Sequence, residues 1–568
     1  MNRKLVGGRW LRWDDERAAQ AYAQGWWDTG TLADSLRQAA RQTPARVALI
    51  DASVDERPRE ESRSPSDPAS VDERPREESR SPSGPAEHRL TCADLYRQAT
   101  GLAHAMLARI PPSSVVSFML PNWHEAAVIY LATTLAGMVA NPILPSMRDR
   151  ELRFILEDSD SRLVFIPSTF ARHDYPPMLL RVTAQLESPP EVVVLRGDCQ
   201  PGQIPFETLI APSAAGPPLP ALDADAVRMI LYTSGTTGRP KGVLHTHNSI
   251  HALIRQIHRH WSVRHGDTFL VASPIAHIGG SIYAFEAPLL LGATAVLMER
   301  WNADDAVELM RAHRCTHMTG ATPFLEQLLV AAQRTGTRLP DLKLFVCGGA
   351  SVSPSLIRRA ATYFDPAVVT RVYGSTEVPV TTVGAPESRD HAADTDGRLG
   401  VAEVKVVDGE IRVRGPQMLA GYLHPEDEDA SFDPDGYFRT GDLGGWVDDD
   451  YLVVTGRAKD IIIRNGENIS PKEVEDVLVN HPEIAEIAVV GLPDERTGER
   501  ACAVVVPRIA SGSGPGIDVT GLRTFLEASG VARFKAPEQV VIWDDLPKND
   551  AGKVLKHQIR AALMDAGQ

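Results

Sequence analysis

The alternation of apolar runs with helical patterns is the feature that most constrains the fold of this chain. Strand-like runs occur at VVSFML (115–120), RLVFI (162–166), VVVL (192–195), TFLVA (268–272), TAVLM (294–298) and LKLFVCGG (342–349). Helix-like segments occur among them at 124–140, 304–313 and 353–364. Strand, helix and strand in succession predict parallel sheets with helices packed on their faces.

The pattern changes after residue 400 to short alternating strands, at AEVKVV (402–407), GEIRVRG (409–415) and YLVVTG (451–456). A chain of 568 residues exceeds the roughly 250–300 residues that one core supports, so more than one domain is expected. The sequence predicts an α/β fold combined with α+β. Residues 1–456 form parallel-sheet αβα subdomains plus a β-rich subdomain, and 457–568 form a small, mobile α+β domain.

A duplicated segment interrupts the N-terminal part of the chain. Residues 53–66, SVDERPREESRSPS, recur unchanged at 70–83. The segment is rich in proline, serine and charge, which is typical of disorder. It lies between the strand-like VALIDA (47–52) and HRLT (88–91). We therefore interpret residues 53–86 as a disordered, duplicated insertion in a surface hairpin.

Composition excludes several classes of protein. The net charge is −15, which argues against a broad nucleic-acid-binding face. Five scattered cysteines without a CxxC pair fit a reducing compartment. The apolar stretch 269–298 contains Pro274, Glu286 and Gly292, so a buried core segment is expected there rather than a membrane span. We expect a cytoplasmic protein with no membrane span and no nucleic-acid partner. Its oligomeric state stays open, with a dimer among the alternatives.

A loop rich in serine, threonine and glycine carries the strongest chemical signal, at LYTSGTTGRPKGVLHTH (231–247). Glycines let successive backbone N–H groups turn toward an anion, and hydroxyls and a lysine add further donors. The loop therefore predicts a polyphosphate site. It differs from the GxxxxGK[ST] loop, because Gly242 follows Lys241. The candidate residues are Thr233, Ser234, Gly235, Thr236, Thr237, Gly238 and Lys241.

This loop resembles the signature of the adenylate-forming superfamily, which includes acyl-CoA synthetases, peptide-synthetase adenylation domains and beetle luciferases. Four further motifs follow in that family's order: VYGSTEV (372–378), YFRTGDLGGW (437–446), GRAKDIIIRNGENISPKEVE (456–475) and LPKNDAGKVLKHQIR (546–560). Together the motifs cover most of the chain outside 53–86, and the chain is identified as a member. The resemblance implies that ATP, Mg²⁺ and coenzyme A are used.

The resemblance also implies roles for individual residues. Tyr373 stacks on adenine, Thr376 meets the α-phosphate and Glu377 holds Mg²⁺. Asp442 accepts the ribose hydroxyls, and Arg457 contacts ribose and phosphate. Lys553 is the catalytic lysine, whose ammonium neutralises the charge that develops at the transferring phosphate. Further nucleotide contacts are expected from Gly349, Ala350, Gly374 and Ser375.

Two sets of residues concern the second half-reaction. Lys459 lies at the family's hinge, about which the C-terminal domain rotates. Relatives carry two glycines where this chain has Asn465 and Gly466, beside the path of the pantetheine arm. Asn tolerates left-handed backbone angles, so we expect the turn to persist. Gly466 and Lys535 are the candidate contacts to coenzyme A.

The acyl pocket is expected near SPIAHIGGS and CGGASVS, from His277, Ile278, Gly279, Ser281, Gly348, Gly349 and Ala350. His277 is also a candidate catalytic residue. Amino-acid-activating relatives carry an Asp near this His, and hydroxybenzoate-activating relatives carry an Asn directly after it. Here the segment has no Asp, and Ile278 follows the His. An apolar aliphatic, alicyclic or bulky polycyclic acid is therefore expected, as in cyclohexanecarboxylate-type and medium-chain CoA ligases.

The main hypothesis is an acyl-CoA synthetase. The alternative is a stand-alone adenylating enzyme that loads the phosphopantetheine of a carrier protein in trans, in secondary metabolism. A luciferase-like oxygenase would need a second chemistry that nothing in the sequence indicates. A non-catalytic binding protein would predict loss of charged motif residues, yet Lys241, Glu377, Asp442 and Lys553 are all present.

Overall fold

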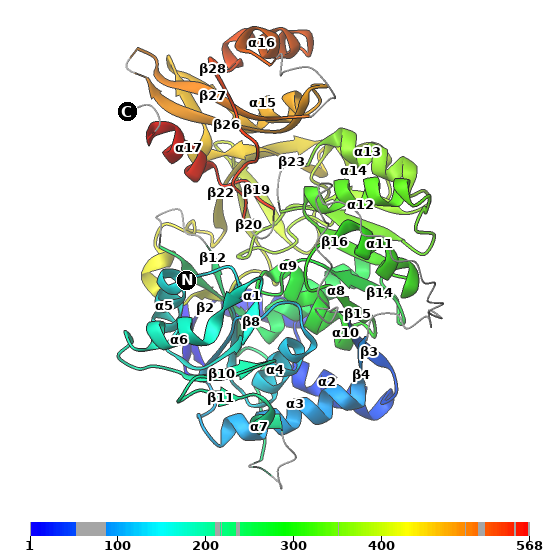
Figure 1. Cartoon of the computed structure of the whole chain (residues 1–568), viewed down its shortest axis with the longest axis vertical. Coiled ribbons are helices and arrows are strands. Elements are labelled where there is room, and N and C mark those ends of the chain that lie inside the picture. Colours follow the sequence, from blue (N-terminus) through cyan, green and yellow to red (C-terminus); the bar gives the residue numbers. More distant parts are fainter. Residues whose placement is uncertain are drawn as a thin grey trace, which may run out of the picture.

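The computed structural model describes residues 2–52, 87–210, 216, 218–233, 239–349, 352–494, 496–508, 517–549 and 552–565. The repeated segment 53–86 lies outside the described residues. Figure 1 shows a smaller C-terminal unit, built on β26–β28 and α15–α17, above a larger body with two large sheets. The predicted fold class, with parallel sheets, a large N-terminal part and a smaller C-terminal part, is confirmed.

One large sheet has eight strands in the order β11-β10-β7-β5-β6-β12-β13-β21. Pairing from β11 to β12 is parallel, and the last two pairings are antiparallel. The strands span Val115–Phe118 (β5), Val139–Pro142 (β6), Ser161–Pro167 (β7), Glu191–Leu195 (β10), Ile204–Pro205 (β11), Val227–Thr233 (β12), Lys241–Thr246 (β13) and Gly421–Tyr422 (β21). Helices packed around it include α4 (His124–Leu135), α5 (Asp149–Asp158) and α6 (Tyr175–Thr183).

The second large sheet has seven strands in the order β18-β17-β16-β14-β15-β3-β4, all parallel except the β3–β4 pair. The strands span Val47–Asp51 (β3), His88–Thr91 (β4), Thr268–Val271 (β14), Thr294–Leu297 (β15), His317–Gly320 (β16), Leu344–Cys347 (β17) and Val368–Arg371 (β18). Its helices include α8 (His247–His260), α11 (Ala303–Ala312), α12 (Thr322–Arg334), α13 (Pro354–Tyr363) and α14 (Arg389–Asp394). The antiparallel β3–β4 pair at the edge of the sheet is the hairpin expected on both sides of residues 53–86.

Two antiparallel units follow in the sequence. A four-stranded sheet pairs β19 (Glu403–Val407), β20 (Glu410–Arg414), β22 (Phe438–Val447) and β23 (Tyr451–Arg457). The C-terminal sheet joins β24 (Ile462–Arg464), β25 (Glu467–Ile469), β26 (Ile484–Asp494), β27 (Gly498–Pro507) and β28 (Gln539–Ile542). It carries α15 (Pro471–Leu478), α16 (Val519–Ala528) and α17 (Lys556–Asp565). These are the β-rich subdomain and the α+β tail that the sequence pattern indicated.

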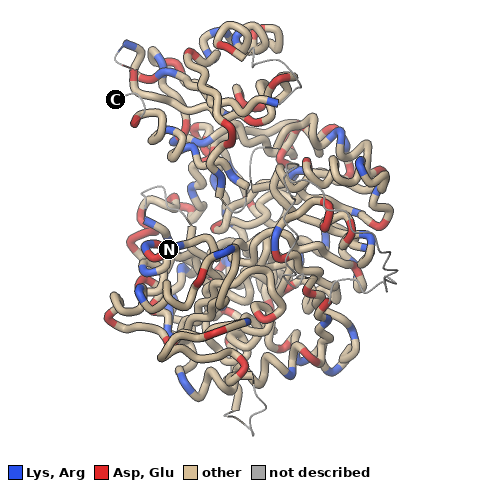
Figure 2. Tube along the Cα trace, in the orientation of Figure 1, with Lys and Arg blue, Asp and Glu red and all other residues tan. Residues whose placement is uncertain are grey.

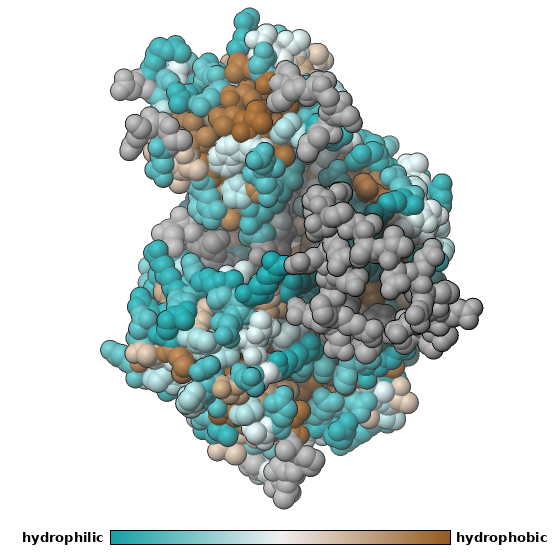
Figure 3. Space-filling view, in the orientation of Figure 1, coloured by the Kyte–Doolittle hydropathy of each residue, from teal (hydrophilic) through white to brown (hydrophobic). Residues whose placement is uncertain are grey.

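The surface differs between the two units. Figure 2 shows Lys and Arg interspersed with Asp and Glu along the described trace, and in the full sequence 74 acidic residues exceed 59 basic ones. Figure 3 shows apolar surface gathered on the C-terminal unit, where Ile542 of β28 is 39% exposed. In the described part of the chain, no helix is long and apolar enough to cross a membrane.

The structure differs from the sequence prediction at two places. The segment 124–140 was expected to be one helix, but α4 ends at Leu135 and β6 begins at Val139. Gly137 separates them with φ +65, a left-handed conformation that glycine adopts at little cost. Within 269–298, the helical segment after α9 (Ile278–Ser281) winds as a π-helix over Ile282–Glu286, before α10 (Ala287–Leu290).

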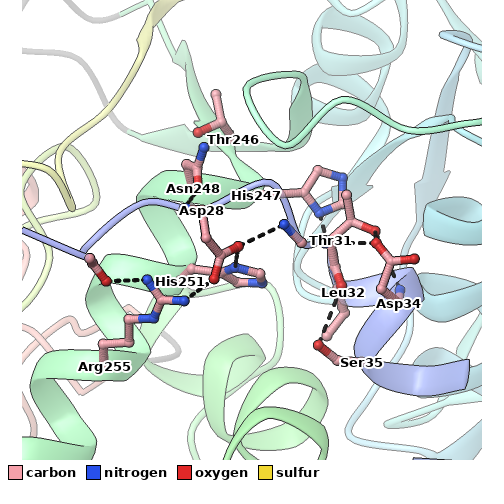
Figure 4. A network of polar contacts seen from close by, with 12 residues as sticks. Asp28, Thr31, Leu32, Asp34, Ser35, Thr246, His247, Asn248, His251 and Arg255 are labelled. Atoms are coloured by element: carbon pink, nitrogen blue, oxygen red, sulfur yellow. Dashed lines mark hydrogen bonds and ion pairs between the residues drawn. The ribbon is translucent and has the colours of Figure 1, made fainter. Parts of the chain in front are cut away.

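The N-terminal segment is fastened to α8 by the polar network in Figure 4. Asp28 forms ion pairs with His251 and Arg255, and its backbone N–H donates to Asn248 Oδ1 at 3.0 Å. The bond to His251 is the largest cause that holds the pKa of Asp28 well below its usual range. The network therefore keeps the link between α1 (Asp15–Ala23) and α2 (Leu32–Gln42) against the helix that directly follows β13.

Candidate active site

An ion pair joins two of the motif residues. Asp442 in β22 and Arg457 at the end of β23 are cross-strand partners, and Arg457 Nε lies 2.7 Å from Asp442 Oδ1. Tyr373, which follows β18, donates its hydroxyl to Asp442 Oδ2 at 2.7 Å. Burial, followed by the charge of Asp442, raises the pKa of Tyr373 well above its usual value. Tyr373 is therefore a neutral donor. Together with Arg457 at the end of β23, it orients the carboxylate of Asp442.

Lys553 lies close to this group. Burial, followed by the positive charge of Arg457, lowers the pKa of the Lys553 ammonium to about 8, while Asp442 opposes that shift. The residue as a whole keeps an exposed surface, so the surrounding protein desolvates the ammonium only in part. A Cβ atom on the neighbouring Gly552 would lie 3.3 Å from Pro323 at the start of α12. The loop with Lys553 therefore packs against the larger body, on the side where Asp442 and Arg457 lie.

The predicted phosphate loop connects two paired strands. Thr233 at the end of β12 and Lys241 at the start of β13 are register partners, so they lie side by side at its base. Lys241 Nζ donates to the carbonyl of Asp427 at 3.2 Å and lies 5.0 Å from the centre of the Tyr422 ring. The central loop residues Ser234, Gly235, Thr236, Thr237 and Gly238 lie outside the described part of the chain.

Glu377 lies near Lys241, because the side chains of both residues contact Tyr422. Its carboxylate accepts hydrogen bonds from Ser375 Oγ at 2.9 Å and from Tyr422 Oη at 3.2 Å. The carbonyl of Thr376 accepts a 2.8 Å bond from His245 Nε2. Burial lowers the pKa of His245 to about 4, so the ring is neutral at pH 7 and donates from Nε2. The strand after the phosphate loop thus holds the backbone of the VYGSTEV segment in place.

Two places in the described part of the chain offer carboxylates to a metal ion. Asp51, His124 and Glu125 are the one group of three potential ligands that converge in the described part of the chain. The guanidinium of Arg196 lies 3.2 Å from Asp51 and 2.7 Å from Glu125. The guanidinium therefore already occupies both carboxylates, which makes the group a poor site for a further cation. Among the residues that the structure describes, no cation is paired with the carboxylate of Glu377, which lies beside Tyr422, whose ring Lys241 approaches.

The expected acyl residues lie on two segments of the chain. His277 precedes the first turn of α9, with Ile278, Gly279 and Ser281 inside that turn. A Cβ atom on Gly279 would meet open space, whereas one on Gly348 would lie 2.9 Å from Val372. Gly349, after β17, has φ +80, and Ala350 lies outside the described residues. Gly374 must also stay a glycine, because a Cβ would lie 2.6 Å from the backbone nitrogen of Val380.

The residues expected at the hinge and at coenzyme A lie beyond β23. Lys459 is in a short 3-10 turn, Ala458–Asp460, between the larger body and the C-terminal sheet. Asn465 and Gly466 form the two-residue turn between β24 and β25 with φ of +50 and +82, as Asn was expected to tolerate. Lys535 is paired with Glu473 at 2.6 Å. Arg464 donates to the carbonyl of Phe534 at 3.0 Å, so the two candidate segments for coenzyme A are neighbours.

Sequence reasoning missed Tyr422 and His245. The residues that bond them to the site, Glu377 and Thr376, lie 45 and 131 positions away. A Gly-Tyr pair after an apolar run and a His between a leucine and a threonine are common patterns. The signal for their roles is therefore spatial, and it emerges only when Thr376 and Glu377 lie against β13 and β21.

Comparisons with known proteins agree with this geometry. The profile of the family described as AMP-binding enzyme matches residues 36–423, and that of its C-terminal domain matches residues 473–553. The chain is 32% identical over 570 residues to a medium-chain fatty-acid–CoA ligase of Escherichia coli, covering 98% of this chain and 94% of that protein.

Two further similarities are to a second curated protein and to a solved structure. The chain is 31% identical over 577 residues to a protein of Mycobacterium tuberculosis named salicyl-AMP ligase / salicyl-S-ArCP synthetase, covering 97% of this chain and 94% of that protein. Among solved structures, ATP-bound MatB from Rhodopseudomonas palustris superimposes with a TM-score of 0.79 at 26% identity. That match covers 95% of this chain and 100% of MatB.

Proposed function

Because the chain belongs to the AMP-binding enzymes and is an AMP-forming acid–thiol ligase, we propose that it is an acyl-CoA synthetase for an apolar carboxylic acid. In the first half-reaction the acid and ATP give an acyl-adenylate and pyrophosphate. In the second, the thiol of coenzyme A takes the acyl group and AMP leaves. The acid is aliphatic, alicyclic or bulky and polycyclic.

The observation that carries the proposal is the approach of Lys553 to the Tyr373–Asp442–Arg457 group. Lys553 lies far beyond Arg457 in the sequence, yet the charge of Arg457 adds to burial in lowering the pKa of Lys553. A cation beside a buried carboxylate and an arginine suits an anionic nucleotide, since its phosphates supply the negative charge that this cluster lacks. This supports nucleotide binding with Asp442 at the ribose and Lys553 at the α-phosphate.

The chemistry follows from these positions. A carboxylate oxygen of the acid attacks the α-phosphorus, and the bond to the pyrophosphate oxygen breaks. Lys553 and Arg457 stabilise the charge that develops on the transferring phosphate, which is electrostatic rather than acid–base catalysis. Lys241 binds the outer phosphates from the base of the β12–β13 loop. Glu377 would hold Mg²⁺, since one carboxylate is enough for a magnesium ion that also binds phosphate oxygens.

The acyl side favours an apolar acid. Ile278 follows His277, so this position offers no side-chain amide to a ring hydroxyl. The open space at Gly279 and the backbone of Gly349 leave room for a bulky group. A substrate ammonium or hydroxyl that found no partner there would lose about 1–3 kcal/mol. The E. coli relative, named a medium-chain fatty-acid–CoA ligase, supports the same class of acid.

A carrier protein acting in trans is the second candidate for the acceptor. The M. tuberculosis relative, whose name joins an adenylate to an S-linked product, supports this alternative. Both candidates share the adenylation step, so they differ only in which pantetheine thiol reaches the C-terminal unit.

A pyrophosphate-exchange screen tests the proposal. Purified protein is incubated with ATP, Mg²⁺, labelled pyrophosphate and a panel of acids: octanoate, cyclohexanecarboxylate, a polycyclic acid, salicylate and leucine. We expect exchange with one or more of the first three and little with the last two. Thioester formation is then measured with coenzyme A and with a phosphopantetheinylated carrier protein. Exchange confined to salicylate or leucine would contradict the acid class, and thioester on the carrier alone would favour the alternative.

A further inference from the structure

Asn122 is a buried amide that connects the two large sheets. It lies in the loop that joins β5 of the eight-stranded sheet to α4, and its side chain is buried, with 3% of the residue exposed. Its Nδ2 donates to the carbonyls of Val271 at 3.2 Å and Ser273 at 3.0 Å. Its Oδ1 accepts from the backbone N–H of Ile275 at 3.0 Å. All three bonds go to the segment that leaves β14 of the other sheet.

These bonds use both hydrogens of the side-chain amide. The opposite orientation would direct Oδ1 at two carbonyl oxygens, so the contacts fix which end of the amide faces which group. Residues 271, 273 and 275 are alternate positions, so the segment is held along its length. His277 follows two residues after Ile275. Its backbone N–H donates to the carbonyl of Pro274 at 3.0 Å.

The same segment is also confined by Gly280. A Cβ atom on Gly280 would overlap the carbonyl oxygen of Pro274 and lie 2.6 Å from that of Ser273. The N–H of Gly280 donates to the carbonyl of His277 at 2.9 Å. The turn with His277 is thus held between the Asn122 amide and the backbone of α9, with little freedom to shift.

We propose that Asn122 is a positioning residue for the acyl site. By fastening residues 271–275 to the loop after β5, it sets the place of His277 and the first turn of α9 relative to the eight-stranded sheet. That sheet carries Thr233 and Lys241, which lie at the base of the phosphate loop. The inference rests on the proposed function, because it takes His277 and Gly279 to line the acid. The inference adds Asn122, which lies beside the eight-stranded sheet. This residue acts through His277 and Gly279 without touching the acid.

The test is Asn122→Asp, which keeps the shape and removes both donors. A carboxylate would face two carbonyl oxygens, so the segment 271–275 should retract and His277 should move. We expect kcat/KM for the acid in pyrophosphate exchange to fall at least tenfold, with KM for ATP and the affinity for AMP within twofold of wild type. Burial among carbonyl oxygens should raise the pKa of the new carboxyl, and its neutral form can donate once. The deficit relative to wild type should therefore shrink between pH 7.5 and pH 6.

Asn141→Asp is the matched control. Asn141 is also fully buried and lies in β6 of the same sheet, but its amide donates to Ser117 within that sheet at 2.9 Å. We expect this variant to lose thermal stability without changing the ratio of kcat/KM for the acid to that for ATP. Asn122→Ser, which keeps one donor, should lie between wild type and Asn122→Asp in kcat/KM for the acid.

Two outcomes would overturn the inference. One is an unchanged kcat/KM for the acid in Asn122→Asp. The other is an equal loss of affinity for acid, ATP and AMP, which would indicate a general structural role. Acid-dependent exchange in the wild type supports the proposed function whatever Asn122 does. Absence of exchange in the wild type would overturn both.

Discussion

At the scale of the residue, the site is organised around the charge of Lys553. Its ammonium is near Arg457 and Lys459, two further cations, with Asp442 and Asp460 as partial compensation. Such a group is poised to lose its proton close to neutral pH unless an anion binds. A bound triphosphate supplies that anion and should restore the ordinary pKa of the lysine.

This predicts a pH dependence of adenylation. The pKa of Lys553 in the free enzyme is about 8, below its value in an unfolded chain, so its protonated form declines as pH rises through 8. We expect kcat/KM for ATP in pyrophosphate exchange to fall above about pH 8. The fall in kcat should come at higher pH, because the bound nucleotide raises the pKa. Coincident limbs in kcat and kcat/KM would contradict this.

The residues that sequence alone could predict are those within contiguous motifs. Asp442 and Arg457 were assigned from separate motifs, and the structure pairs them across β22 and β23. Asn122 and Tyr422 could not be assigned, because each acts by bonding to a segment far away in the sequence. Their residue types are common in loops and strand ends, so only the folded arrangement distinguishes them.

At the scale of the element, a buried ion pair couples β12 to the π-helical segment. Arg228 of β12 and Glu286 at the end of the π-helix are each 1% exposed, with Nη2 and Oε1 3.1 Å apart. Tyr130 of α4 donates to Glu286 Oε1 at 2.6 Å. β12 ends at the predicted phosphate loop and the π-helix follows the turn of His277, so the pair joins the elements that lead to the proposed nucleotide and acid sites.

A comparison of single and double variants tests this pair. Glu286→Leu leaves the Arg228 guanidinium buried without its partner, which should lower the free energy of unfolding by about 3–5 kcal/mol. Arg228→Met combined with Glu286→Leu replaces the pair with apolar groups and should recover most of that loss. Thermal and denaturant unfolding measure both. A double variant as unstable as the single one would show that the charges are not coupled.

Most elements were predictable because their patterns are long and regular. The apolar runs at 115–120, 268–272 and 342–349 became β5, β14 and β17. The end of α4 was missed because the residues on both sides of Gly137 are equally apolar, so periodicity could not separate helix from strand. The π-helix at 282–286 has no local signature. Its extra residue per turn accompanies the buried placement of Glu286 among tertiary partners.

At the scale of the whole molecule, the described contacts between the C-terminal unit and the larger body include a bond from Ser470 Oγ to the carbonyl of Thr455 at 2.6 Å. Gly552 packs near Pro323, and Asn480 Oδ1 accepts a bond from Ser355 Oγ at 2.8 Å. This arrangement brings Lys553 toward Asp442 and suits adenylation. The residues proposed for coenzyme A, Gly466 and Lys535, are on other segments of the unit. We therefore predict that the unit rotates about Lys459 between half-reactions.

Lys459→Pro tests the rotation. Proline fixes φ near −65° and is tolerated in the first turn of a helix, where Lys459 lies now. We expect pyrophosphate exchange to stay within a few-fold of wild type, while thioester formation falls at least tenfold, because the other backbone state is blocked. Thioester formation at the native rate would place the hinge elsewhere in the chain.

The most direct test of the central claim separates the two half-reactions with Lys553→Ala. Acid-dependent exchange of labelled pyrophosphate into ATP reports adenylation alone, and removal of one charge-stabilising group at such a site costs about 10²–10³ in rate. We predict that exchange falls by at least a hundredfold, while the same variant converts supplied acyl-adenylate and coenzyme A to thioester within a few-fold of wild type. Equal loss of both activities, or exchange that persists, would contradict the role given to Lys553 and the two-step reaction built on it.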